Sequence, residues 1–299
     1  MGGYSVVISG ASGLIGTALA ASLESDGHRV VRLVRREPRS PDEIKWRPGQ
    51  EPLNPGVLRG ASTVVNLNGE SIGRLPWTKN YRRVLLESRL DPTRTLANAL
   101  RRLGDEAPLF VSASAVGFYG DRPGELLTEK SDAGDTFLAQ LCVRWEAEAL
   151  KAGRTANVAL IRTAPILHPD ATLKPLIALT KLGLGGPLGS GNQVWPWISL
   201  DDEVRAIRHI IDKRLTGPIN LTGPRVATMN DIGRELAKKL HRPYLLPVPS
   251  WALRAVVGAD VAESLLLTNA DVRPSALEQN GFEFRHPTVE AAITSALAA

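Results

Sequence analysis

Short apolar runs alternate with helical patterns through the first two thirds of the chain. Runs rich in β-branched residues predict strands at residues 5–9, 29–34, 63–67, 109–113 and 157–162, and helical patterns cover 16–25, 79–103 and 137–152. This alternation is typical of parallel strands that are joined by helical crossovers. We therefore expect an α/β fold with a doubly wound parallel sheet.

The character of the chain changes after Arg162. Residues 183–191 read GLGGPLGSG, which is too rich in glycine for regular structure, and they lead into an aromatic segment, QVWPWISLDD. A helix at 202–213, a strand within GPINLTGP and a proline-marked helical tail follow. We predict a main domain of residues 1–165 plus 191–217 and a smaller α+β lobe of residues 166–190 plus 218–299.

A glycine-rich turn joins the first predicted strand to the first predicted helix, in the segment YSVVISGASGLIG. Gly10 allows a sharp turn off the strand, Gly13 leaves room for a pyrophosphate, and Gly16 lets the helix pack closely on the sheet. Glycine turns are common, but a strand, this turn and an amphipathic helix in that order are typical of a dinucleotide site. The sequence thus predicts a Rossmann-type domain.

The end of the second predicted strand indicates which dinucleotide binds. NAD sites of this type place a carboxylate about 20 residues beyond the glycine turn, where it accepts hydrogen bonds from the ribose. Here the chain reads VVRLVRREPR, so that Val34, Arg35 and Arg36 precede the first acid, Glu37. An arginine can clamp a 2′-phosphate. We expect NADP(H) with Arg35 as its contact, and the alternative is a basic loop without a ligand.

Composition narrows the remaining classes of function. The 299 residues are 43% hydrophobic and 22% charged, and the formal net charge of +5 comes from dispersed basic residues, so we expect no nucleic-acid partner. A single cysteine, Cys142, favours a reducing compartment, and five scattered histidines predict no metal site. No apolar run is long enough to span a membrane, and the first strand begins too early to leave room for a signal peptide. We expect a cytoplasmic protein.

Several segments resemble the extended short-chain dehydrogenase/reductase superfamily. They are NLNGE at residues 66–70, the strand and Tyr-Gly turn FVSASAVGFYGD, and WISLDD at residues 197–202. The longer blocks WTKNYRRVLLESRLDPTRTL, ALIRTAPIL, LGLGGPLGSGNQVWPWI and NLTGP…LPVPSWAL are similar to its "epimerase family protein" subgroup, whose C-terminal domain has no assigned function. The resemblance covers nearly the whole chain and implies an NADP-binding Rossmann domain with a substrate-type lobe.

The same resemblance implies a set of cofactor contacts at the pyrophosphate, the 2′-phosphate, the turn after the fourth strand and the nicotinamide. In that order they are Gly10, Ser12, Gly13, Leu14, Ile15 and Gly16; Val34 and Arg35; Leu67, Asn68, Gly69 and Glu70, with Arg89 from the Ser-Arg pair; and Ile166.

The catalytic pair of the superfamily is absent from its usual helix. Most members use Tyr-x-x-x-Lys after the fifth strand, where the lysine lowers the pKa of the tyrosine. Here the helix reads FLAQLCVRWEAEALKAG, without a tyrosine. One register places Cys142 and Glu146 at the two positions, and another places Gln140 and Arg144 there.

Ser114 and Tyr119 remain as candidate catalytic residues. Ser114 would bond a substrate carbonyl or hydroxyl and Tyr119 would donate a proton, but the two are five residues apart, where the superfamily typically has four. Tyr119 also fits a purely structural turn. Trp195 and Trp197 either stack on a ligand or pack the lobe against the main domain.

Two functions stay open. The first is an NADP(H)-dependent oxidoreductase or epimerase that acts on a small or nucleotide-linked hydroxy or keto compound. The second is a non-catalytic NADP(H)-binding redox sensor or scaffold. The superfamily often dimerises through the two long outer helices, but their many charges here also fit a monomer, so we expect a monomer or a homodimer.

Overall fold

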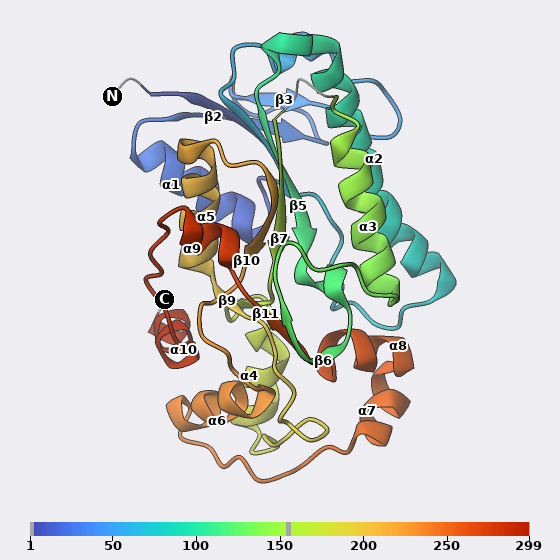
Figure 1. The fold of residues 1–299 in the computed structure, drawn as a ribbon, viewed down its shortest axis with the longest axis vertical. Coiled ribbons are helices and arrows are strands. Elements are labelled where there is room, and N and C mark those ends of the chain that lie inside the picture. The colour runs from blue at the N-terminus through green and yellow to red at the C-terminus, as the bar shows by residue number, and fades with distance from the viewer. Residues whose placement is uncertain (1–2, 154–156, 299) are drawn as a thin grey trace.

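A seven-stranded parallel sheet forms the centre of the protein (Figure 1). The computed structural model describes residues 3–153 and 157–298. The spatial order β10-β7-β5-β4-β1-β2-β3 reverses direction beside β1, as in doubly wound sheets. The strands are β1 (Ser5–Ser9), β2 (Arg29–Val34), β3 (Glu43–Lys45), β4 (Thr63–Asn66), β5 (Leu109–Ala115), β7 (Val158–Thr163) and β10 (Gly217–Leu221). The predicted fold class is confirmed.

Helices cover both faces of this sheet, with one pair on each face. The pairs are α1 (Leu14–Ser25) with α5 (Leu200–Lys213), and α2 (Lys79–Leu103) with α3 (Phe137–Leu150). Neighbouring residues of one strand enter different cores, since Val6 packs with α1 and α5 while Val7 packs with α2. A sheet that is buried on both faces needs apolar residues at consecutive positions, which explains the continuous apolar runs in the sequence.

The remaining elements form a smaller lobe beyond the carboxyl ends of the strands (Figure 1). They are β6 (Arg122–Leu127), β8 (Ile166–Leu167), α4 (Leu173–Lys181), β9 (Ile198–Ser199), α6 (Met229–Lys239), α7 (Ser250–Val257), α8 (Ala259–Val261), β11 (Ala270–Val272) and α10 (Val289–Ala298). One late helix, α9 (Ser275–Gln279), lies instead beside α5 and packs against β10 (Figure 1). Two short parallel pairs, β6 with β11 and β8 with β9, tie these elements together.

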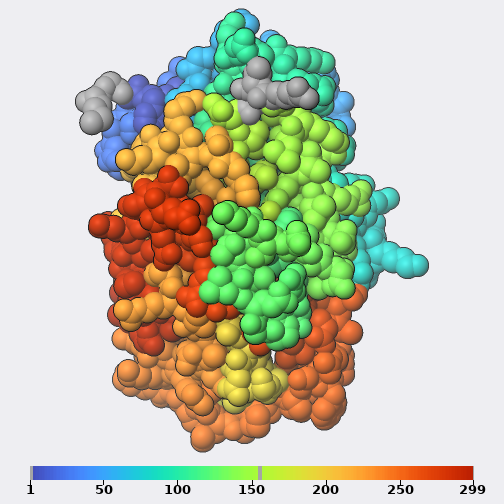
Figure 2. Space-filling model, in the orientation of Figure 1, coloured from blue at the N-terminus to red at the C-terminus, as the bar shows by residue number. Residues whose placement is uncertain are grey.

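Two strands cross the predicted boundary between the main domain and the lobe. β10 runs to Leu221, past the expected boundary after residue 217, because it pairs with β7 along its whole length. β6 lies within the expected main domain but pairs with β11 of the lobe. In the space-filling view the green segment that contains β6 lies against the red and orange C-terminal part (Figure 2). The chain therefore crosses between the two parts more often than the sequence indicates.

The longest described helix, α2, is more basic than α3, its neighbour on the same face of the sheet. α2 spans 25 residues and ends with Arg101 and Arg102 in its last turn. Within residues 3–153 and 157–298, no helix combines the length and the apolar character that crossing a membrane requires.

Candidate functional site

The glycine turn between β1 and α1 is pressed against the end of β4. Gly10 has a φ of +81°, and a Cβ placed there would lie 2.7 Å from both the carbonyl carbon and oxygen of Leu67. A Cβ on Gly16 would lie 2.3 Å from the carbonyl oxygen of Gly10. Backbone atoms cannot move aside as a flexible side chain can. Packing alone therefore requires glycine at positions 10 and 16.

Gly13 is different, because its surroundings are open. A Cβ there would meet its nearest neighbour, the Gly10 oxygen, at an ordinary 3.5 Å. Gly13 is the N-cap of α1 and makes no side-chain cap. Ser12 and Gly13 are exposed, and Leu14 and Ile15 are half-buried. The amides that begin α1 thus face open space, as a bound phosphate requires.

We expect Gly10→Ala to destabilise the fold more than a matched glycine change. Gly27 also has a positive φ, +78°, but a Cβ there meets nothing within 4 Å. Gly27→Ala should cost only the left-handed conformation, about 1 kcal/mol, whereas Gly10→Ala adds the clash with Leu67 and should cost about 2–3 kcal/mol. Urea unfolding of both variants measures the difference. Equal losses would mean that the β1–α1 turn can move away from β4.

Two adjacent arginines, Arg35 and Arg36, follow β2 and differ in their partners among the described residues. Arg36 donates two hydrogen bonds to Glu43, of 2.7 and 2.6 Å, and this pair, with a further bond from the Arg39 amide, lowers the pKa of Glu43 to about 2. Arg35 is exposed and has no ion pair or hydrogen bond to any residue of the described chain. The geometry leaves Arg35 available to an anion, beside Val34 at the end of β2.

The turn after β4 is held by a buried network of polar side chains. The Asn66 amide donates to Thr93 (2.7 Å), while its oxygen accepts from Ser9 (3.0 Å) and Asn68 (2.8 Å). The Asn68 amide also donates to the Ser9 hydroxyl at 2.6 Å. These bonds join β1, β4 and α2, so they fix the backbone of the following residues at the edge where the glycine turn lies.

Arg89 reaches the same turn from α2. Its guanidinium donates to the carbonyls of Leu85 and Glu70, both at 3.0 Å, and lies 5.2 Å from the ring centre of Trp145. A Cβ on Gly69 would lie 3.0 Å from the central carbon of the Arg89 guanidinium. Burial lowers the pKa of Arg89. No carboxylate of the described residues pairs with this cation, which therefore suits an anionic ligand.

The two predicted catalytic hydroxyls lie in one buried network. Ser114 donates to Glu146 at 2.7 Å, and the Glu146 carboxylate accepts two bonds from Arg162, of 2.8 and 2.9 Å. Arg162 also donates to the Tyr119 oxygen (2.9 Å), whose hydroxyl donates to Asn220 (2.6 Å). Ser114 is 3% exposed and Tyr119 is fully buried.

This network gives both residues a positioning role between β5, α3, β7 and β10. Burial raises the pKa of Tyr119, whereas acid–base catalysis near neutral pH needs a lowered one. Their catalytic roles stay predictions, and the geometry does not favour them. Arg162 is buried and neutralised by its ion pair with Glu146. Asn220 carried no signal in the sequence beyond its place in a strand.

Neither register of α3 restores the missing catalytic pair. Gln140 and Arg144 are exposed on the outer side of the helix, so they do not face the sheet. Cys142 and Glu146 do face the sheet, but the Glu146 carboxylate is already paired with Arg162. Burial raises the pKa of the Cys142 thiol to about 11, which keeps it neutral.

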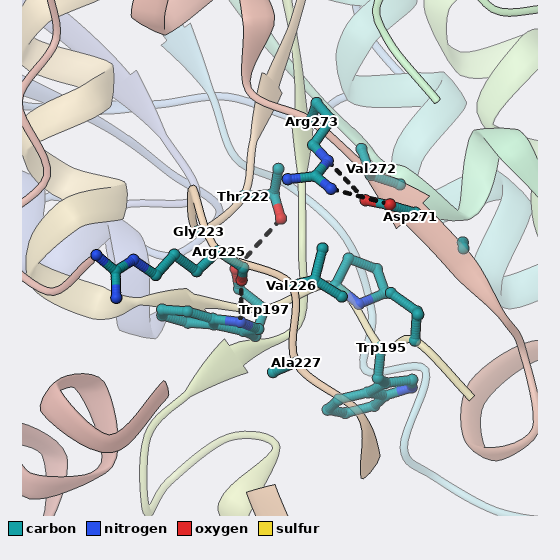
Figure 3. A pocket seen from close by; sticks show the side chains of 13 residues that line it. Trp195, Trp197, Thr222, Gly223, Arg225, Val226, Ala227, Asp271, Val272 and Arg273 are labelled. Carbon is teal, nitrogen blue, oxygen red and sulfur yellow. Dashed lines mark hydrogen bonds and ion pairs between the residues drawn. The ribbon is translucent and has the colours of Figure 1, made fainter. Parts of the chain in front are cut away.

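Trp195 and Trp197 hold the lobe together. Their indole N–H groups donate to the backbone carbonyls of Leu265 (3.0 Å) and Arg225 (3.1 Å), and their side chains are buried. The hollow beside them, shown in Figure 3, has a volume of about 10 Å³, which is room for no more than one water. The structure therefore favours packing over stacking on a ligand.

Glu203 is a buried carboxyl that the sequence did not single out. It is fully buried near the start of α5, and one of its oxygens accepts from the Thr163 hydroxyl at 2.7 Å. The other oxygen has no partner among the described residues. Burial raises the pKa of Glu203 to about 8, so the group is mostly protonated at neutral pH.

We expect Glu203→Gln to flatten the dependence of stability on pH. The folded pKa lies above the ordinary 4.5, so between about pH 5 and pH 8 the folded protein holds a proton that the unfolded chain releases. The free energy of unfolding should fall as pH rises through this range, by up to about 1.4 kcal/mol per pH unit. Urea unfolding at several pH values measures the slope. Glu278→Gln, at an exposed position of α9, is the control, and equal slopes in both variants would contradict the assignment.

Two family models match the chain. The NAD dependent epimerase/dehydratase family matches residues 6–221, and a domain of unknown function (DUF1731) matches residues 248–296. The first match ends where β10 ends, and the second covers most of the C-terminal part of the lobe.

Relatives and solved structures resemble the whole chain. An epimerase family protein of Mycobacterium bovis is 40% identical over 291 residues, which is 96% of both chains. The human epimerase family protein SDR39U1 is 30% identical over 298 residues, 98% of this chain and 99% of the relative. A crystal structure of human SDR39U1 (isoform 2) with NADPH matches with a TM-score of 0.88 and 28% identity, over 99% of this chain and 100% of that one. The chain thus belongs to the NAD dependent epimerase/dehydratase family, among the epimerase family proteins.

Proposed function

We infer that this protein binds NADP(H) along the carboxyl edge of its sheet. The observation that carries the proposal is the contrast between Arg35, whose side chain has no partner in the described part of the chain, and Arg36, which is bound to Glu43. A free arginine at the end of β2 suits a 2′-phosphate, whereas a ribose without that phosphate calls for a carboxylate. The similarity to a human protein solved with NADPH supports the same cofactor.

Each proposed contact is a residue at this edge. The pyrophosphate would lie over Gly13, whose own amide donates to the Gly10 carbonyl, and would be held by the amides of Ser12, Leu14 and Ile15, with Gly10 and Gly16 shaping the turn. Val34 and Arg35 would hold the adenosine ribose and its phosphate; Leu67, Asn68, Gly69, Glu70 and Arg89 would line the middle; and Ile166 would lie beside the nicotinamide. When bound, the cofactor supplies or accepts a hydride, and the protein orients it.

The proposed reaction is hydride transfer to or from a small hydroxy or keto compound. Epimerisation is less well supported, because it needs a base that removes a proton and returns it, and Tyr119 and Ser114 are both turned into the interior. The same observation favours a second candidate, a non-catalytic NADP(H)-binding sensor or scaffold, in which the bound cofactor fixes one conformation.

Two measurements separate these possibilities. Titration of the purified protein with NADPH and with NADH tests the cofactor, and we expect tighter binding of NADPH. Loss of nicotinamide absorbance in the presence of carbonyl compounds tests turnover. Equal affinity for NADPH and NADH would contradict the cofactor assignment, and binding without turnover would select the sensor.

A further inference from the structure

Large apolar side chains are exposed together at the far end of the C-terminal lobe. They lie in the last turn of α4 and just after it, in the segment between α6 and α7, and in the first turn of α7; they are Leu179, Leu182, Leu184, Leu245, Leu246 and Trp251. The side chains of this set, the distal patch, are 43–75% exposed. Proteins rarely leave such side chains gathered in one place unless the surface binds a partner.

Backbone contacts hold the parts of the distal patch side by side. The amides of Leu245 and Leu246 both donate to the carbonyl of Gly185, at 2.9 and 3.2 Å. A Cβ on Gly186 would lie 2.0 Å from the carbonyl oxygen of Leu246, so the segment after α4 is in direct contact with the segment after α6. The orange segment between α6 and α7 runs along the end of the molecule, away from the sheet (Figure 1). The patch is therefore one surface at this end.

The same two segments carry basic residues and no acid. Residues 173–184 and 238–256 contain no aspartate or glutamate, and their basic residues are Lys174, Lys181, Lys238, Lys239, Arg242 and Arg254. Glu235 lies 3.6 Å from Lys238 and 3.8 Å from Lys239, and Glu263 pairs with Arg254.

Three of these cations have no acidic partner among the described residues. They are Lys174, Lys181 and Arg242, and all three are exposed. The Arg242 guanidinium donates to the backbone carbonyl of Lys181 at 3.2 Å, which places both cations at the end of α4, beside Leu182. The apolar side chains thus have an excess of positive charge at their border.

We propose that the distal patch docks on a membrane surface that contains anionic lipid. The leucine side chains and the indole ring of Trp251 enter the boundary between headgroups and acyl chains, and the cations meet the lipid phosphates. Binding to a surface needs no helix that crosses the bilayer. The inference does not depend on the cofactor, because no residue of the patch belongs to the proposed NADP(H) site.

Charge favours a lipid surface over other occupants. In a symmetric dimer the patch would meet its own copy, and Lys174, Lys181 and Arg242 would then face further cations. Interfaces between proteins are also depleted in lysine, whereas tryptophan with lysine and arginine is typical of the boundary of a bilayer.

Tryptophan fluorescence measures the docking directly, because Trp251 is 72% exposed while every other tryptophan is at most 7% exposed. Vesicles of equimolar phosphatidylcholine and phosphatidylglycerol should shift the emission to the blue and protect it from acrylamide. Each cation beside an anionic leaflet raises the binding constant about fivefold, so vesicles of phosphatidylcholine alone should bind at least about tenfold more weakly. Flotation of the purified protein with the same vesicles measures binding independently.

A matched pair of variants locates the surface. Leu245→Glu, at a position that is 75% exposed, should abolish flotation with the anionic vesicles. Leu150→Glu makes the same change at the 57% exposed last residue of α3, outside the patch, and should leave flotation unchanged.

A second pair tests the charges and does not alter the apolar side chains. Lys174→Gln with Lys181→Gln should lower the binding constant for the anionic vesicles about 25-fold. Arg101→Gln with Arg102→Gln removes the same charge from exposed positions at the end of α2 and should not change it.

Absence of both the blue shift and flotation with the anionic vesicles would overturn the proposal. Equal binding to vesicles with and without phosphatidylglycerol, or equal losses in Leu245→Glu and Leu150→Glu, would overturn it as well. Dimerisation without vesicle binding, seen by analytical ultracentrifugation and lost in Leu245→Glu, would assign the patch to a second copy of the chain instead.

Discussion

Replacement of Arg162 by methionine should lower the free energy of unfolding by about 3–5 kcal/mol. Arg162 and Glu146 form an ion pair whose side chains are only 5% and 9% exposed. The variant leaves the Glu146 carboxylate inside the protein without its two guanidinium donors, and it also removes the donor to Tyr119. Chemical unfolding followed by circular dichroism measures the loss.

A second arginine provides the matched control. Arg94 of α2 pairs with Glu148, which lies on α3 as Glu146 does, but the Arg94 side chain is 47% exposed. Because water screens this pair, Arg94→Met should cost at most about 1 kcal/mol. The double change Arg162→Met with Glu146→Met should recover much of the loss, since no charge is then left unpaired. A single Arg162→Met variant as stable as Arg94→Met would show that the buried pair does not hold β7 to α3.

Replacement of Arg35 by aspartate should weaken NADPH binding about 100-fold and leave NADH binding unchanged or tighter. The change removes charge-assisted hydrogen bonds to the 2′-phosphate and puts a carboxylate in their place, which repels the phosphate but can accept bonds from a ribose hydroxyl. Arg35 makes no bond within the described chain, so the fold should not be affected. Fluorescence titration with both cofactors measures the change in selectivity.

Arg36→Gln is the control for this prediction. Arg36 is adjacent in sequence but occupied by Glu43, so the variant should alter the NADPH affinity by no more than about threefold. Unchanged NADPH binding in Arg35→Asp, or a larger loss in Arg36→Gln, would mean that the phosphate contact lies elsewhere or that the cofactor is not NADP(H).

Most of the sheet could be predicted from the sequence, because a buried parallel strand and an amphipathic helix have distinct local patterns. The predicted bounds of β1, β2 and α2 agree with the structure. The lobe was harder to predict from the sequence. The partner of a short strand such as β6 lies far away in the chain, and no local pattern indicates which segment it is. The same is true of β10, which the sequence placed across a domain boundary.

The glycine turn and Arg35 could also be found from the sequence, because their chemistry depends on local order. The catalytic candidates could not be judged in this way. Whether Ser114 faces a substrate or Glu146 depends on how α3 packs on β5, and the Tyr119–Asn220 bond joins residues 101 positions apart. The sequence shows which polar groups exist, and only the packing shows which of them are already satisfied.

The pairing of β6 with β11 has a consequence for the nascent chain. During synthesis the strand at Arg122–Leu127 leaves the ribosome long before its partner at Ala270–Val272. Until the partner arrives, β6 presents unpaired amides and carbonyls, a template for association with other chains. A product truncated after the Rossmann domain would keep this exposed edge permanently. Pairing with β11 of the C-terminal lobe therefore removes one exposed strand edge of the N-terminal half in the finished fold.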